Sequence, residues 1–127
     1  MGDVVAANAS PSGGSKMREL PKVETLREAV REVIENNIRD HYQPHRFIQA
    51  TEGGNASDLG VVCERLINKA ETLEWLEGAL ERIPTLLTLE DFVSRQGSEW
   101  GMSVETVEAA KARVERFDEI AGTARYS

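Results

Sequence analysis

The sequence is poor in several kinds of residue, and each shortage excludes a class of protein. Of 127 residues, one is cysteine, two are histidine and 6% are aromatic. A single cysteine, Cys63, cannot close an intramolecular disulfide or build a cysteine-rich zinc site, so a reducing compartment is the default expectation. No stretch approaches the about 20 apolar residues that span a bilayer, and the N-terminus lacks the basic start and apolar run of a secretory signal. These shortages predict a cytoplasmic protein without a membrane partner.

An excess of basic residues is also missing. The chain has 15 Lys and Arg against 22 Asp and Glu, a net charge of −7. Proteins that coat nucleic acid neutralise phosphates with clustered cations, so we expect no direct binding to nucleic acid. The excess acid lies entirely in residues 51–127, because residues 1–20 and 21–50 are each balanced. This acidity favours a protein partner, for which a basic surface is one option.

What the chain does have is helical periodicity, and the expected fold is all-α. Apolar residues recur at steps of three and four along most of the sequence, which predicts a compact bundle of about five to six short helices. Strand patterns are almost absent. Residues 1–20, rich in Gly, Ser, Ala and Asn, predict a flexible N-terminal tail. The helical domain is then residues 21–127, with one modest core.

Caps and breakers place the helices. We expect the first helix to run from about Val23 to Asp40; Thr25 and Glu28 have capping-box spacing, although Pro21 could start the helix earlier. Pro44 ends that helix and suits the start of a second, which Gly53-Gly54 closes. The remaining helices are expected at 57–68, at 72–83 before Pro84, from Thr88-Leu89-Glu90-Asp91 to Gln96-Gly97-Ser98, and from the N-cap Ser103 to Gly122. The apolar stripe expected of the last helix is Val107, Ala110, Val114, Phe117 and Ala121.

Candidate catalytic groups are few. His41 and His45 are four apart, but Pro44 between them breaks the helix that would bring both to one metal. Cys63 could meet either histidine only through folding, and its place in an apolar stripe predicts a buried thiol. The acids Glu90 and Asp91 are interpreted as first-turn contacts with the helix dipole. We therefore expect no cofactor, no metal and no catalytic residues.

The residues most suggestive of function are candidates for contact with a partner. Arg46 stands in the first turn of a helix, where a cation is unfavourable. It needs either an ion pair to a neighbouring helix or a partner's acid or phosphate to clamp. The glutamates of the fourth helix are either a solvated face or a docking face for a basic partner, and the two tryptophans are either interface anchors or edges of the core. The full set of candidates is Tyr42, His45, Arg46, Glu74, Glu77, Glu81, Trp75 and Trp100.

The stretch Tyr42-Gln43-Pro44-His45-Arg46-Phe47 resembles the opening motif of a small, uncharacterised bacterial all-helical domain. Members of that domain carry Tyr-x-Pro-Thr-Arg-Phe, a Gly-Gly pair, a Thr-(Val/Leu)-Glu helix start and a closing Ala-Arg-x-Arg-Leu helix. The matching segments here are Gly53-Gly54, Thr88-Leu89-Glu90 and Ala110-Lys111-Ala112-Arg113-Val114. His45 and Val114 depart from the pattern. The resemblance implies a compact helical module and assigns no activity.

Taken together, the sequence favours a small acidic helical protein–protein interaction module, a non-catalytic adaptor or regulator. An alternative is an acidic inhibitor from a mobile element that occupies the groove of a basic nucleic-acid-binding protein. An enzyme ranks third, because the sequence offers no convergent polar cluster.

Overall fold

The computed structural model describes residues 17–52 and 58–127, and within these residues the fold is all-α as expected. Their only strand-like pairing is an isolated bridge between Arg18 and Tyr126. No helix in this part of the chain has the length and apolar content to cross a membrane. The elements are α1 (Leu26–Arg39), α2 (His45–Glu52), α3 (Leu59–Asn68), α4 (Ala70–Arg82), α5 (Leu89–Gln96), a 3₁₀ helix η3 (Gly97–Trp100) and α6 (Val104–Ala121).

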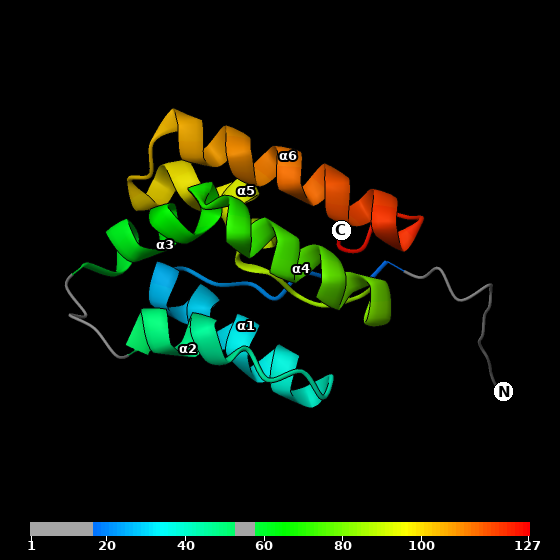
Figure 1. The fold of residues 1–127 in the computed structure, drawn as a ribbon. Coiled ribbons are helices and arrows are strands. Elements are labelled where there is room, and N and C mark those ends of the chain that lie inside the picture. The colour runs from blue at the N-terminus through cyan, green and yellow to red at the C-terminus, as the bar shows by residue number, and fades with distance from the viewer. Residues whose placement is uncertain (1–16, 53–57) are drawn as a thin grey trace, which may run out of the picture.

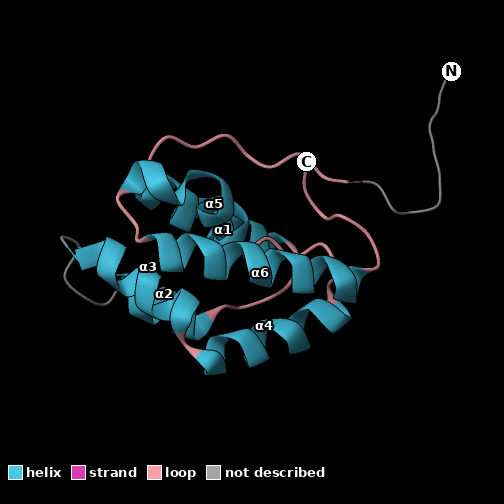
Figure 2. Cartoon of the chain, turned by 90° about the horizontal axis from the view of Figure 1, so that it is seen from above, coloured by secondary structure: helices cyan, strands magenta, loops and turns pink. Residues whose placement is uncertain are grey.

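The short helix α5 forms the centre of the bundle. Leu89, Phe92 and Val93 are buried on it, and α6 packs along it as well as against α3 and α4. Figures 1 and 2 both show α4 and α6 running side by side. In Figure 1, α1 and α2 lie together on the opposite side of α4 from α6. The α1–α2 hairpin joins the rest of the bundle through contacts of α1 with α5 and of α2 with α3.

The local signals that were expected to bound the helices are confirmed. Thr25 and Glu28 form a reciprocal capping box at α1, and the Ser103 hydroxyl accepts the amide of Thr106 at α6. Gly122 follows α6 in the left-handed conformation with φ of 81°, which glycine adopts without strain. The residues expected to close α2, Gly53-Gly54, lie outside the described residues.

The expected N-terminal tail is too long at its C-terminal end. The amide of Arg18 donates to the carbonyl of Arg125, and the amide of Ser127 donates to the carbonyl of Arg18, each at 2.9 Å. Leu20 packs against a cluster that contains Tyr126. Backbone pairing with a distant segment was invisible in the composition on which the prediction rested. The rest of the expected tail, residues 1–16, lies outside the described residues.

Two helices bury a polar residue where the apolar stripe predicted otherwise. In α6, Val107, Ala110 and Phe117 are buried as expected, but Arg113 rather than Val114 is the buried residue between them. In α1, the spacing of Leu26, Val30, Val33, Ile34 and Ile38 predicts that Ile38 faces the core. Ile38 is nevertheless 45% exposed, while the neighbouring Asn37 is only 2% exposed. Both polar side chains bond to carbonyl oxygens between helices, and this need overrides the apolar pattern.

Candidate functional site

The joint between α1 and α2 is built as a tight turn. His41 has a positive φ of 64°, a conformation in which His is enriched among non-glycine residues. Its amide and that of Tyr42 bond back to α1, at the carbonyls of Ile38 and Asn37. Pro44 is buried, and α2 begins at His45 immediately after it. Both histidines are exposed, His41 within the turn and His45 at the first position of α2. The turn therefore accounts for two histidines so close in the sequence.

A groove of about 640 Å³ opens between this joint and α4. The joint and the start of α2 form one wall, α4 forms the other, and Val33 and Asn37 of α1 with residues 87–90 form the floor. Most of the lining is apolar, including Phe47, Ile67 and Leu76. A concave, mostly apolar site with a few converging polar groups is the kind of surface that binds ligands and partner segments.

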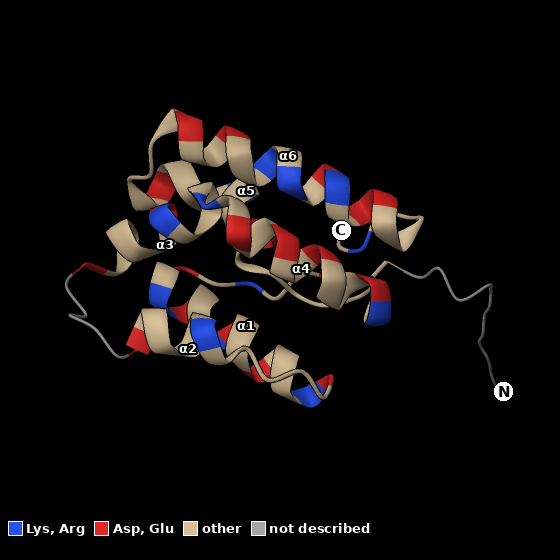
Figure 3. Ribbon diagram, viewed as in Figure 1, with Lys and Arg blue, Asp and Glu red and all other residues tan. Residues whose placement is uncertain are grey.

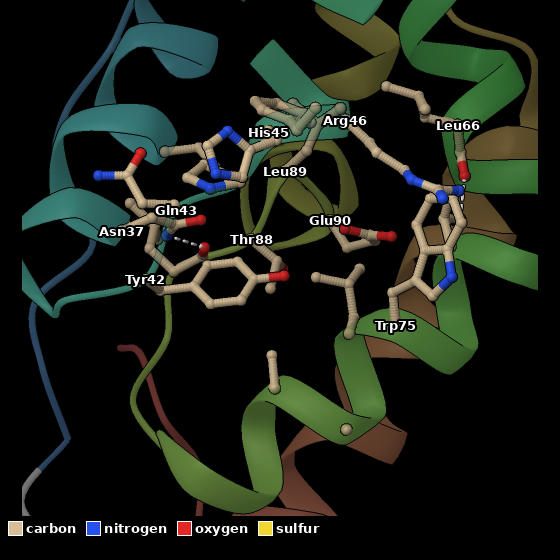
Figure 4. A pocket seen from close by; sticks show the side chains of 18 of the residues that line it. Asn37, Tyr42, Gln43, His45, Arg46, Leu66, Trp75, Thr88, Leu89 and Glu90 are labelled. Carbon is tan, nitrogen blue, oxygen red and sulfur yellow. Dashed lines mark hydrogen bonds between the residues drawn. The ribbon is translucent and has the colours of Figure 1, made fainter. Parts of the chain in front are cut away.

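Six of the eight residues singled out as interaction candidates line this one groove. Tyr42, His45 and Arg46 come from the first wall, formed by the joint and the start of α2, and Glu74, Trp75 and Glu81 come from α4. Figure 4 shows the Tyr42 hydroxyl pointing into the cavity, with His45 and Arg46 above it. The candidates that the sequence suggested separately are therefore parts of one surface.

Arg46 reaches across the groove to Trp75. Its guanidinium carbon lies 4.4 Å from the centre of the indole ring (Figure 4), a cation–π contact. Of the two alternatives for Arg46, an ion pair to a neighbouring helix is absent among the described residues. The aromatic face supplies the compensation instead, and it also joins the two walls at one end of the groove.

Two of the predicted interaction residues lie elsewhere. Glu77 does not line the groove; it accepts a hydrogen bond of 3.0 Å from Nε of Arg116 on α6. Trp100 is half-buried against the core, and its indole N–H donates to the carbonyl of Glu24 at 3.1 Å. Trp100 therefore lies at an edge of the core, which was the alternative reading of both tryptophans.

The floor of the groove holds a buried carboxylate that the sequence did not single out. Glu90 is 3% exposed and lines the groove. Its Oε2 accepts from Nη1 of Arg113 at 2.9 Å, and Arg113 also donates to Thr72 Oγ1 and to the carbonyls of Leu66 and Lys69. Arg113 thus donates hydrogen bonds to the carbonyl oxygens at the junction between α3 and α4 and to one oxygen of Glu90. The position of Arg113 between Ala110 and Phe117 on the apolar face of the last helix was the sequence signal that could have indicated a buried acidic partner.

The next residue, Asp91, lies in a second buried network. Its Oδ1 accepts from Nη2 of Arg125 at 2.6 Å, and its Oδ2 accepts from Nη1 of Arg125 and from the amide and hydroxyl of Thr88. Arg125 is fully buried and also bonds to Asp118 and to the carbonyl of Leu86. Glu90 and Asp91 do occupy the first turn of α5. Their first-turn position is therefore confirmed, whereas their burial was not expected.

Burial also changes the acidity of these groups. Loss of hydration raises the pKa of Glu90 above its ordinary value, and the neighbouring Arg113 only partly opposes this. The pKa of Asp91 is raised for the same reason, against the opposing charge of Arg125. A buried carboxylate that is incompletely compensated is a common feature of functional sites and of structural ion pairs alike.

The remaining chemical candidates do not assemble. Cys63 is fully buried, and loss of hydration raises the pKa of its thiol to about 12, so the reactive thiolate is suppressed at neutral pH. In residues 17–52 and 58–127, no group of three or more His, Cys, Asp or Glu side chains is placed to hold a metal ion.

Comparison with protein-family models, with curated proteins and with solved structures found no match to this chain. The resemblance to a bacterial helical domain through the Tyr-x-Pro-x-Arg-Phe motif stays an expectation. Functional inference therefore depends on the groove itself.

Proposed function

We propose that this protein is a non-catalytic protein–protein interaction module whose groove between α2 and α4 captures an amphipathic helix of a partner protein. The observation that carries the proposal is the convergence of Tyr42, His45, Arg46, Glu74, Trp75 and Glu81 on a single apolar groove. A groove bounded by helices suits an apolar helical face, which presents anchors at steps of three and four residues. Exposed aromatic residues such as Trp75, which is 36% exposed, are frequent anchors of interfaces.

The charge on the α4 wall indicates the chemistry of the partner. Glu74 and Glu81 are exposed, and neither forms an ion pair with another residue of the described part. Figure 3 shows acidic residues spaced along α4, and the chain carries a net charge of −7. Basic residues flanking the apolar face of a partner helix would complement this wall and accelerate association.

The alternative of an acidic inhibitor that occupies a nucleic-acid-binding groove has weaker support. Such an inhibitor would present a continuous acidic surface in place of phosphates. Acidic and basic residues are interspersed along α6 in Figure 3, and Arg116 of α6 pairs with both Glu77 and Glu119. The groove is mostly apolar, which favours capture of a helix.

A displayed library of amphipathic peptides tests the proposal without knowledge of the natural partner. Peptides of about 16 residues, roughly 24 Å long when helical, are selected on the wild-type protein and then titrated against a blocked variant, Gly78→Leu. Gly78 lines the groove, and a Cβ placed there has no atom within 4 Å. Glu74, Trp75, Glu81 and Arg82 line the groove three or four residues away, so position 78 is on the same helix face.

The matched control is Gly60→Leu on α3, where a Cβ also has no atom within 4 Å but the position does not line the groove. We expect Gly78→Leu to weaken the selected peptides about tenfold or more, as a lost anchor site does, and Gly60→Leu to leave them unchanged. The charge reversal Glu74→Lys should also weaken them, whereas Glu77→Lys, at a position that does not line the groove, should have the smaller effect. Selected peptides that bind both leucine variants equally would overturn the proposal.

A further inference from the structure

Glu90 and Asp91 are adjacent buried residues of α5, and their carboxylates accept different numbers of hydrogen bonds. Both oxygens of Asp91 accept hydrogen bonds, from Arg125 and from Thr88. Glu90 accepts from Arg113 through Oε2 and from its own backbone amide, and no other residue of the described part donates a hydrogen bond to its carboxylate. Of the two carboxylates, only Glu90 lines the groove.

Arg113 cannot supply the second bond that Arg125 supplies to Asp91. Its Nη2 donates to the carbonyl of Lys69 at 2.7 Å, and its Nη1 is shared among Glu90, Thr72 and the carbonyl of Leu66. The guanidinium is held at the α3–α4 junction, to one side of Glu90, and it is only 8% exposed. A carboxylate oxygen that is buried without a full set of donors is unfavourable, and a donor brought by a ligand would relieve that cost.

The surroundings of Glu90 suit a cationic side chain with a long apolar stem. Figure 4 shows the Glu90 carboxylate between Thr88 and the Arg46–Trp75 pair, facing the cavity. Apolar residues such as Leu76 and Leu89 line the approach, and the methylenes of a lysine or arginine pack well on such a surface. The indole of Trp75 already holds one guanidinium on its face. The Tyr42 hydroxyl, which points into the cavity from the opposite wall, offers a second acceptor.

We propose that Glu90 determines the specificity of the groove by accepting a lysine or arginine side chain, presented from the apolar face of the partner helix, on its carboxylate. This inference rests on the proposed function, since it assigns the anchor residue of the same partner. The partner is therefore a helix with one basic residue embedded among apolar anchors, in addition to basic residues on its flank. The loss of hydration that raises the pKa of Glu90 agrees with a carboxylate that lacks a full complement of charge.

The test uses the selected peptides that lose affinity in Gly78→Leu. We expect these groove-dependent peptides to share one lysine or arginine on the apolar face. Replacing it with norleucine, which keeps the stem and removes the charge, should weaken binding to the wild-type protein about tenfold, the effect of about 1.4 kcal/mol. The same replacement should change binding to Glu90→Gln by less than about twofold, because the glutamine presents no charge to complement.

The control variant is Glu64→Gln, which removes a carboxylate of α3 that bonds to the Ser103 amide and does not line the groove. It should keep the full tenfold discrimination. Folding of each variant is verified by the protection of the single thiol of Cys63 from a thiol reagent. If Glu90→Gln does not fold, the comparison of lysine and norleucine peptides on the wild-type protein still tests the inference. Norleucine and lysine peptides of equal affinity would overturn the inference.

The two proposals fail in different ways. Groove-dependent peptides that carry no basic residue on the apolar face, or that discriminate equally on Glu90→Gln, would contradict the role of Glu90 and leave the interaction module intact. Peptides whose binding ignores Gly78→Leu would contradict the module itself.

Discussion

At the scale of single residues, the molecule is unusual for the ionised groups that it encloses. Glu90, Asp91, Arg113 and Arg125 are all less than a tenth exposed. Removing such charges from water is costly, and their mutual attraction offsets the cost only when hydrogen bonds complete the arrangement. The Asp91–Arg125 pair meets this condition. In the Glu90–Arg113 pair, the Arg113 guanidinium has several hydrogen-bond acceptors, whereas the Glu90 carboxylate accepts from only one side chain. The burial of Glu90 is therefore less well compensated than that of Arg113.

We predict strong coupling between Arg113 and Glu90. Arg113→Met should lower the free energy of unfolding by about 3–5 kcal/mol, because it leaves a buried carboxylate without its cation and removes the donor to Lys69. Adding Glu90→Leu should recover part of that loss, since the orphaned charge is then gone. Urea denaturation of both single variants and the double variant measures the coupling. Effects that add to within about 0.5 kcal/mol would show that the two side chains do not interact.

At the scale of secondary-structure elements, the acidic residues of α4 have two different environments: one pairs with α6 and others line the groove. Its glutamates at positions 71, 74, 77 and 81 fall within an arc of about 120° when placed at 100° steps, which suggested a single acidic face. The structure divides that arc, because Glu77 at one edge leans to Arg116 on α6 while Glu74 and Glu81 line the groove. Gly78 stands in the groove-facing part with open space beside it.

Glycine positions give a direct test of this description. Gly78→Ala should raise the free energy of unfolding by about 0.5–1 kcal/mol, because alanine loses less backbone entropy in a helix and meets no neighbour. Gly97→Ala should lower it by about 1–3 kcal/mol through overpacking, because its Cβ would lie 2.9 Å from methyl carbons of Val93 and Val107. Chemical denaturation measures both. A loss of stability in Gly78→Ala would mean that the space beside it is filled.

The elements themselves were largely predictable, because their signals are local. Thr25 with Glu28, Ser103 with its first turn, and Pro84 after α4 each act within a few residues, and the helix boundaries follow them closely. The buried role of Cys63 was also predictable, since an apolar stripe surrounds it. Caps and helix breakers depend only on residues close in the sequence, so they can be recognised without tertiary contacts.

The groove was predictable only in part, because its walls meet through tertiary contacts. Arg46 and Trp75 were each noticed, but a contact between residues 29 positions apart cannot be read from spacing. The floor was missed: Asn37, Thr88 and Glu90 looked like ordinary polar residues of helices and caps. Glu90 in particular has the sequence context of a first-turn acid, and only the approach of Arg113 from α6 reveals its burial.

At the scale of the whole molecule, the C-terminal residues after α6 join segments that are far apart in the sequence. Arg125, Tyr126 and Ser127 bind the α4–α5 connection, α5 and the segment at Arg18. The α1–α2 hairpin faces α4 across the groove, and the Arg46–Trp75 contact joins the two walls.

The two tryptophans provide the most direct measurement of the central claim, which is that a partner helix binds between α2 and α4. Each indole N–H gives a separate resonance in an ¹⁵N correlation spectrum, and Trp75→Phe assigns them. Titration with a selected peptide should shift the Trp75 resonance, because that ring lies at the groove, and leave Trp100 in place, because its N–H is bonded to Glu24. A peptide that binds and shifts Trp100 while Trp75 stays unmoved would contradict the claim.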